Sequence, residues 1–162
     1  MSDNAAIPTT SHGTAVQVNG KGILLRGASG SGKSSIAMRL LDECRLSNTT
    51  GFLIADDRIC VEQKNNALFV SAPDNLRGLM EIRGLGIVAM KCIKQAKLDL
   101  VVDLVPEEFF ERYPQQGIQS TSLSGMELLR IHIEERNPDA AAIIRTYLHL
   151  TDTDNDAFQI ET

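Results

Sequence analysis

The sequence predicts a single α/β domain with a mixed β-sheet and flanking helices. Gly27–Ser34 matches G-x-x-x-x-G-K-[ST] without a mismatch, the pattern of a loop whose backbone N–H groups surround phosphates. The apolar run Gly22–Arg26 enters this stretch, and Ser35–Leu41 leaves it with helical spacing. The nearly continuous β-branched run Leu98–Val105 is typical of a buried sheet strand. Together these observations predict a sheet built around a phosphate-binding (Walker A) loop.

Composition limits the classes of protein to which the chain can belong. It has 162 residues, of which 43% are hydrophobic and 4% aromatic, with no Trp, so we expect one domain with an aliphatic core. A net charge of −5 argues against a general nucleic-acid binder. No apolar run approaches the ~20 residues that cross a bilayer, and the first ten residues do not resemble a signal peptide. With three widely spaced cysteines, these features predict a cytoplasmic protein without nucleic-acid or membrane partners.

In the first half of the chain, turn signals separate short strands. Residues 1–11 are small and polar and predict a mobile arm. Asn19-Gly20 is a two-residue hairpin signal, so the strand that enters the glycine-rich loop should pair antiparallel with the strand before it. The elements predicted here are a strand over Thr14–Val18, a strand over Gly22–Arg26, a helix from Ser34 to about Cys44, a strand over Gly51–Ala55, and a hairpin of Ile59–Glu62 with Ala67–Val70.

The second half contains longer polar connections. The predicted elements are a short helix over Ser71–Leu79, a loop over Met80–Ile87, a strand over Leu98–Val105, a surface excursion over Pro106–Gly117 with a helical turn near Glu107–Arg112, an irregular stretch over Ile118–Gly125, a strand over Leu128–Ile133, a helix over Pro138–Leu150 and a solvated acidic tail over Thr151–Thr162. No internal repeat or domain boundary is evident. We therefore expect residues 1–162 to form one domain with its core at about 12–150.

The glycine-rich stretch predicts a nucleotide site. Its glycines allow the backbone to fold around phosphates, and the N-terminus of the following helix adds a positive dipole end. Lys33 would reach the β- and γ-phosphates, and the Ser34 hydroxyl would bind Mg²⁺. The predicted nucleotide-binding residues are Gly27, Ala28, Ser29, Gly30, Ser31, Gly32, Lys33, Ser34 and Ser35.

Other polar residues could supply the chemistry. Asp56-Asp57 ends a buried strand, where functional residues of α/β sheets gather, although Asp is also common in turns. Glu81 and Arg83 flank a second glycine-bearing loop and could serve a metal and a phosphoryl group, or form a surface salt bridge. Asp103 lies within an apolar strand and competes with Asp57 for the role of Mg²⁺-holding carboxylate.

Five motifs follow one another along the chain, namely His12-Gly13, Gly27–Ser34, Ile54–Asp57, Ser71–Pro73 and Met80–Ile87, and the Glu-Ile-Arg-Gly-Leu-Gly-Ile string is far more specific than the glycine-rich loop. Together and in this order, the motifs resemble the catalytic domain of HPr kinase/phosphorylase. The resemblance implies a fold similar to the nucleotide-binding domain of phosphoenolpyruvate carboxykinase. It also implies an ATP-dependent kinase for a serine of HPr, the small phosphocarrier of the bacterial sugar phosphotransferase system. Many members run the reverse reaction with inorganic phosphate, and the family is typically hexameric.

The resemblance carries roles to individual positions. Lys33 would lie on the phosphates, and Ser34 and Glu81 would bind Mg²⁺. Asp57 would accept the serine proton, and His12 corresponds to the catalytic-site histidine of the family. The remaining candidate catalytic residues are Asp56 and Arg83.

Two departures from the family pattern affect the expectations. The chain begins almost at the catalytic core and so resembles the short version of α-proteobacteria. The family also has a Pro-Gly-Arg-Asn segment whose Arg supports the reverse reaction, and the corresponding stretch here is Glu135–Asp139, which leaves dephosphorylation open. Two other functions stay open as well, namely a small-molecule kinase and a nucleotide-binding regulator without catalysis.

Overall fold

The computed structural model describes residues 9–114 and 119–153, which form strands, two α-helices and two short 3-10 turns. In chain order the elements are β1 (Thr9–His12), β2 (Thr14–Val18), β3 (Lys21–Arg26), α1 (Lys33–Leu46), β4 (Gly51–Ala55), β5 (Arg58–Lys64), β6 (Ala67–Ser71), η1 (Asp74–Leu76), β7 (Leu79–Ile82), β8 (Gly86–Ala89), β9 (Gln95–Val105), η2 (Glu107–Phe109), β10 (Ser120–Leu123), β11 (Met126–Glu134) and α2 (Ala140–Thr153).

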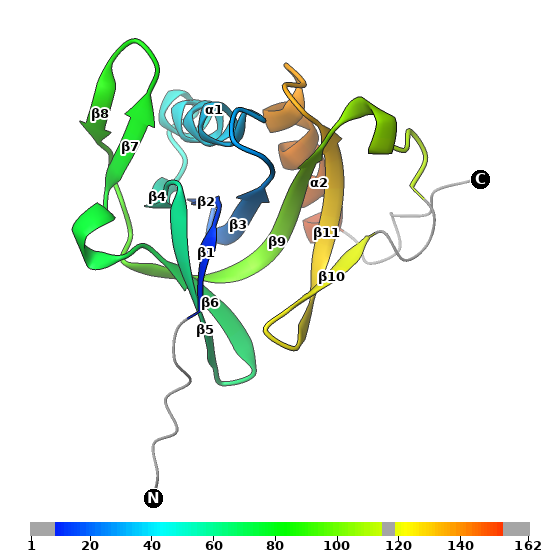
Figure 1. The fold of residues 1–162 in the computed structure, drawn as a ribbon, viewed down its shortest axis with the longest axis horizontal. Helices are drawn as coiled ribbons and strands as arrows, with labels where there is room; N and C mark the ends of the chain where they lie inside the picture. The colour runs from blue at the N-terminus through cyan, green and yellow to red at the C-terminus, as the bar shows by residue number, and fades with distance from the viewer. Residues whose placement is uncertain (1–8, 115–118, 154–162) are drawn as a thin grey trace, which may run out of the picture.

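A large mixed sheet is the centre of the fold, as predicted (Figure 1). Its strand order is β1-β5-β6-β9-β3-β2-β4, with β11 beside β9 and β10 beside β11. β3 and β11 run parallel to β9, and the other pairs are antiparallel. The 11-residue strand β9 pairs with β6 near its start and with β3 and β11 further along. β9 therefore connects the two parts of the sheet.

Two apolar layers lie on opposite faces of the central strands. Leu25 of β3 and Val102 of β9 pack under α1 and α2, whereas Leu24 of β3 packs toward β5 and β6. Both helices cover the same face, and β1, β5 and β6 lie on the other (Figure 1). The largest fully buried side chains in the described part of the chain are Ile, Leu and Met, which confirms the predicted aliphatic core.

Local signals placed most elements correctly. Asn19 and Gly20 have φ of 49° and 81°, the left-handed backbone that a tight hairpin between β2 and β3 requires. α1, β4, the β5–β6 hairpin and β9 lie where they were expected. α2 begins two residues later than predicted, because the Asn137 side chain accepts a hydrogen bond from the Asp139 N–H (2.8 Å) ahead of the helix.

The segment after β6 differs from the prediction. The helix expected over Ser71–Leu79 is only the 3-10 turn η1, because Gly78 turns with φ of 75° and β7 begins at the next residue. The loop expected over Met80–Ile87 is the β7–β8 hairpin, which projects beyond the body of the sheet (Figure 1). Met80 is 1% exposed and packs into the core beneath α1, so its burial decides the pairing.

Three further expectations need correction. Within Ile118–Gly125, expected to be irregular, Ser120–Leu123 form β10 against β11, while residues 115–118 lie outside the described residues. Thr9–Ser11, expected in a mobile arm, belong to β1 and pair with β5, while residues 1–8 lie outside the described residues. The acidic tail was expected from Thr151, but α2 continues to Thr153, and residues 154–162 are likewise not described. Within residues 9–114 and 119–153, no helix is long and apolar enough to span a membrane.

Candidate active site

Residues 27–32, here called the glycine loop, connect β3 to α1. Gly30 and Gly32 have φ of 80° and 107°, so the loop requires residues that tolerate left-handed backbone. Lys33 is 6% exposed, and its Nζ donates to the backbone oxygens of Gly27 and Ala28, both at 2.8 Å. The lysine thus lies along the inside of the loop, while Ala28, Ser29 and Gly30 are exposed.

Two features of the loop match an anion site. Burial lowers the pKa of the Lys33 amine, and the nearby carboxylates of Asp57, Asp56 and Glu135 act in the opposite direction. The Ser31 hydroxyl is buried and has no hydrogen-bond partner among the described residues. An unsatisfied hydroxyl beside a buried cation is suited to a bound phosphate oxygen.

Asp56 connects three parts of the site. Its Oδ1 accepts hydrogen bonds from Ser34 Oγ (2.8 Å) and Thr14 Oγ1 (3.0 Å), and its Oδ2 accepts one from the Glu81 backbone N–H (3.2 Å). The carboxylate therefore connects the start of α1, the start of β2 and the β7–β8 hairpin. A hydroxyl and a carboxylate at contact distance are ligands that Mg²⁺ uses together with phosphates and water. Among the described residues no cluster of three or more His, Cys, Asp or Glu forms a metal site.

Asp57 stands beside this group with its carboxylate directed outward. Its side chain is 71% exposed, and its Oδ1 lies 3.2 Å from His12 Nδ1. Asp57 has φ of 68°, a conformation held by the hydrogen bond from the Gly13 N–H to its backbone oxygen (3.0 Å). The turn between β4 and β5 therefore presents an accessible carboxylate with an imidazole next to it.

Of the two candidate residues on the β7–β8 hairpin, only Glu81 contacts the Asp56 group. Glu81 contacts Asp56 through its backbone, and its side chain is exposed. Arg83 is also exposed, in the turn between the two strands, and shows no bond to the other candidate residues within the described chain. Ser35 is exposed in the first turn of α1.

Asp103 is not part of this group. Both of its carboxylate oxygens are bound by Arg26, at 2.7 and 2.8 Å, and the described residues show no contact between Asp103 and Ser34 or Asp56. Two hollows among the described residues lie away from the glycine loop, one near the C-terminal ends of α1 and α2 and one between α1 and β8. The candidate site lies at the ends of β3 and β4, where Lys33 is buried and Asp57 is exposed.

Two contributors were not assigned a role from the sequence. Thr14 is fully buried and donates to Asp56, but a threonine that opens an apolar strand carries no distinguishing signal. Arg136 has φ of 58°, and its backbone N–H and Nε donate to the Ser31 and Gly30 oxygens at 3.0 and 3.2 Å. The segment after β11, whose alignment with the family pattern was unclear, thus lies against the glycine loop.

Comparison with known proteins identifies the family of this chain. The family described as the HPr Serine kinase C-terminal domain matches residues 3–150. The chain is 36% identical over 134 residues to an HPr kinase/phosphorylase of Lactobacillus acidophilus, covering 78% of this chain and 39% of that protein. It is 33% identical over 145 residues to one of Caldicellulosiruptor bescii, covering 83% and 45%. The chain thus spans less than half the length of these curated relatives.

A solved structure shows the same fold. The Hpr(Ser) kinase/phosphatase from Coxiella burnetii superposes with a TM-score of 0.74 at 22% identity, covering 89% of this chain and 96% of that one. This likeness concerns the fold alone, whereas the family match covers most of the sequence. The chain belongs to the HPr serine kinase C-terminal domain family.

Proposed function

We propose that this chain is an ATP-dependent protein kinase that phosphorylates a serine of an HPr-type phosphocarrier. Family membership supports this proposal. The observation that carries it is the grouping of Lys33, Ser34 and Asp56 beside the exposed carboxylate of Asp57. A phosphate-holding cation, a metal-binding pair and an accessible base are what phosphoryl transfer to a hydroxyl requires.

The residues present fit ATP and Mg²⁺. The backbone of the glycine loop, the Ser31 hydroxyl and Lys33 would hold the phosphates, since this stretch combines an unsatisfied donor, a cation and a helix N-terminus. Ser34 and Asp56 would hold the metal, with Glu81 of the hairpin as the further ligand that the resemblance implies. Mg²⁺, when bound, neutralises charge that develops on the transferred group.

Asp57 would act as the base toward the acceptor serine. Its exposure leaves it accessible to a protein substrate, which an enclosed carboxylate would not be. The serine hydroxyl proton passes to the Asp57 carboxylate while the hydroxyl oxygen attacks the γ-phosphorus and ADP leaves. His12 orients this carboxylate through the 3.2 Å contact. Exposed Arg83 would contact the phosphoryl group that is transferred.

The reverse reaction is a second candidate activity. Arg136 donates to two oxygens of the glycine loop, so a guanidinium lies beside the position proposed for the phosphates. Phosphorolysis would transfer the phosphoryl group of phosphoserine to inorganic phosphate, giving serine and pyrophosphate. Loss of pyrophosphate release in Arg136→Ala, with forward transfer retained, is the expected result. Equal loss in both directions would contradict a specific role in the reverse reaction.

One experiment separates the proposed kinase from its rivals. The full chain is incubated with Mg²⁺·ATP and purified HPr, and intact-mass spectrometry detects addition of one phosphoryl group. A nucleotide-binding regulator would bind ATP without transfer, and a small-molecule kinase would leave HPr unmodified while consuming ATP with a metabolite mixture.

A variant tests the proposed base. We expect Asp57→Ala to abolish transfer to HPr while ATP binding is largely retained, because the side chain lies outside the glycine loop. Transfer at a near wild-type rate would refute this assignment.

Sedimentation analysis of the same preparation tests the hexamer that the family resemblance implies.

A further inference from the structure

Arg26 and Asp103 form a two-pronged ion pair at the end of β3. Arg26 Nε donates to Asp103 Oδ1 at 2.7 Å, and Nη2 donates to Oδ2 at 2.8 Å. The side chains are only 27% and 17% exposed. A paired fork of this kind fixes both distance and orientation, unlike the single contact of a typical surface ion pair.

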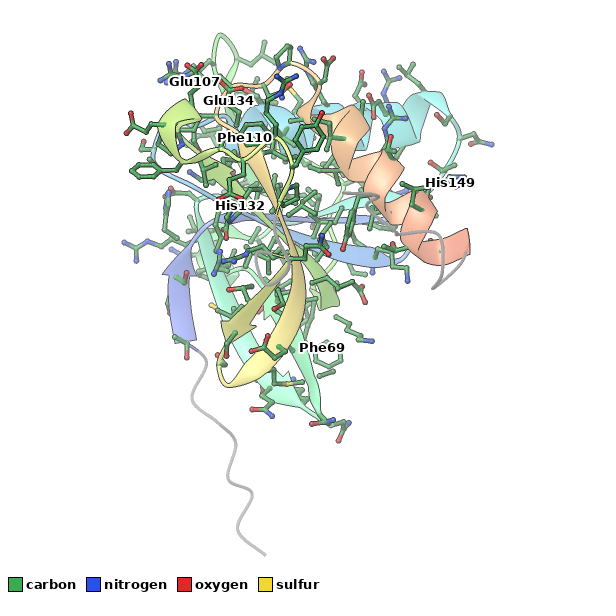
Figure 2. All side chains as sticks on the ribbon, turned by 90° about the vertical axis from the view of Figure 1, so that its right-hand side faces the viewer. Phe69, Glu107, Phe110, His132, Glu134 and His149 are labelled. Carbon is green, nitrogen blue, oxygen red and sulfur yellow. The ribbon has the colours of Figure 1, made fainter. Side chains whose placement is uncertain are left out.

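Other polar groups surround the same carboxylate. Arg130 Nη1 and His132 Nε2 lie 3.7 and 4.0 Å from Asp103 Oδ2, and Arg26 Nη2 also donates to Thr121 Oγ1 at 3.4 Å. Figure 2 shows His132 on β11 at the same end of the sheet as Phe110 and Glu134, whereas His149 lies apart on α2. Asp103 is therefore the shared anion of a cluster that joins β3, β9, β10 and β11.

Arg26 and Asp103 are the last pair of opposite residues in the β3–β9 register before the glycine loop. In the parallel register Arg26 is opposite Asp103 on one side of β9, and His132 is opposite Asp103 on the other. The next residue, Gly27, begins the loop and lies against β9. A Cβ at Gly27 would come within 3.0 Å of Leu104 Cβ and 3.2 Å of the Leu104 backbone oxygen. A sideways shift of β3 on β9 would therefore move the loop with it.

The strands joined by the cluster also supply the contacts on the far side of the loop. Beyond His132, β11 ends at Glu134, and the N–H of the next residue, Glu135, donates to the Val105 oxygen at 2.9 Å. Arg136 follows and donates to the Ser31 and Gly30 oxygens. The start of the loop and the segment that contacts its middle both depend on the alignment of β3, β9 and β11.

We propose that Arg26 and Asp103 are positioning residues for the glycine loop, and this inference rests on the kinase function proposed above. They touch no substrate. They hold β3 in register on β9 so that the backbone N–H groups and Lys33 stay aimed at the nucleotide phosphates. Asp103 thus has a role other than metal binding.

The test uses neutral polar variants of the full chain. In Arg26→Gln and Asp103→Asn we expect the ADP dissociation constant, measured by calorimetry with Mg²⁺, to rise about tenfold. We expect kcat to fall between tenfold and a hundredfold, because displacement of the reacting groups by about 1 Å costs that much. The double variant should be no worse than the more damaged single variant, since both remove the same contact. Arg26→Lys, which keeps the charge without the fork, should give an intermediate affinity.

A matched control separates positioning from general stability. The exposed pair Arg45–Asp42 has a similar N–O distance of 2.7 Å but lies at the far end of α1, so Arg45→Gln should change neither affinity nor kcat. Thermal unfolding without ligand and with ADP is measured for every variant. A lower melting temperature with unchanged ADP affinity and kcat, or additive losses in the double variant, would overturn the inference. A wild-type chain that binds no ADP would instead refute the proposed function, and the inference with it.

Discussion

Gly22→Ala should disrupt the contact between β3 and β9. A Cβ at Gly22 would lie 2.0 Å from the Lys97 backbone oxygen and 3.0 Å from the Lys97 carbonyl carbon. Real Cβ atoms almost never approach closer than 3.0 Å, so the strands would have to separate by about 1 Å. The obstacle is backbone within the sheet, next to the irregularity where the register shifts between Gly22 and Ile23. The neighbouring bond from the Gly22 N–H to Asp99 Oδ2 (2.9 Å) would be strained as well.

The expected cost is about 3 kcal/mol, at the upper end of overpacking penalties. With a urea slope of about 2 kcal/mol/M, this shifts the unfolding midpoint by about 1.5 M. Urea unfolding monitored by circular dichroism measures it.

Gly20→Ala is the matched control. Gly20 has φ of 81°, but a Cβ added there would meet no heavy atom within 4 Å, so the variant should lose only about 1 kcal/mol from left-handed backbone strain. If Gly22→Ala destabilised the protein no more than Gly20→Ala, the steric reasoning would be wrong. Because β3 leads into the glycine loop, the surviving folded fraction of Gly22→Ala should also bind ADP more weakly.

Three other outcomes are expected. Ser34→Ala removes a donor to Asp56 and a proposed metal ligand, so transfer to HPr should need about tenfold more Mg²⁺, measured by Mg²⁺ titration of the initial rate. Burial, assisted by Arg130, lowers the pKa of His132 below its ordinary value of 6.5. The folded state then binds fewer protons, so this group's contribution to stability is complete above pH 6.5 and declines as the pH falls toward the folded pKa. NMR titration, with the His132→Gln variant used to assign the signal, should show that the pKa of His132 is lowered. Met80→Ala should cost about 2–4 kcal/mol in urea unfolding, because this 1%-exposed side chain anchors the β7–β8 hairpin.

Local sequence signals were sufficient for much of the fold. Asn19-Gly20 favours a tight turn by its own residue types. The apolar spacing of α1 and the β-branched run of β9 likewise indicate, within each segment, which residues are buried. The grouping of Asp56-Asp57 near the glycine loop was also predictable, since the ends of neighbouring strands meet at one sheet edge. The segment over residues 71–89 was misjudged because one turn of helix and a short hairpin give similar patterns until Met80 is placed in the core.

The tertiary structure decided which partners these residues have. Arg26 and Asp103 are 77 residues apart, and Arg136 and Gly30 are 106 apart, so no local pattern links them. The residues alone left Asp103 a candidate metal ligand, and the register of β3 on β9 places it opposite Arg26, which donates to both of its carboxylate oxygens. The composition and apolar spacing of a segment indicate which of its residues are buried, because that pattern depends only on each residue and its near neighbours in the sequence. Pairing across a sheet depends on which distant strand lies alongside and at what register, and only the folded chain sets that.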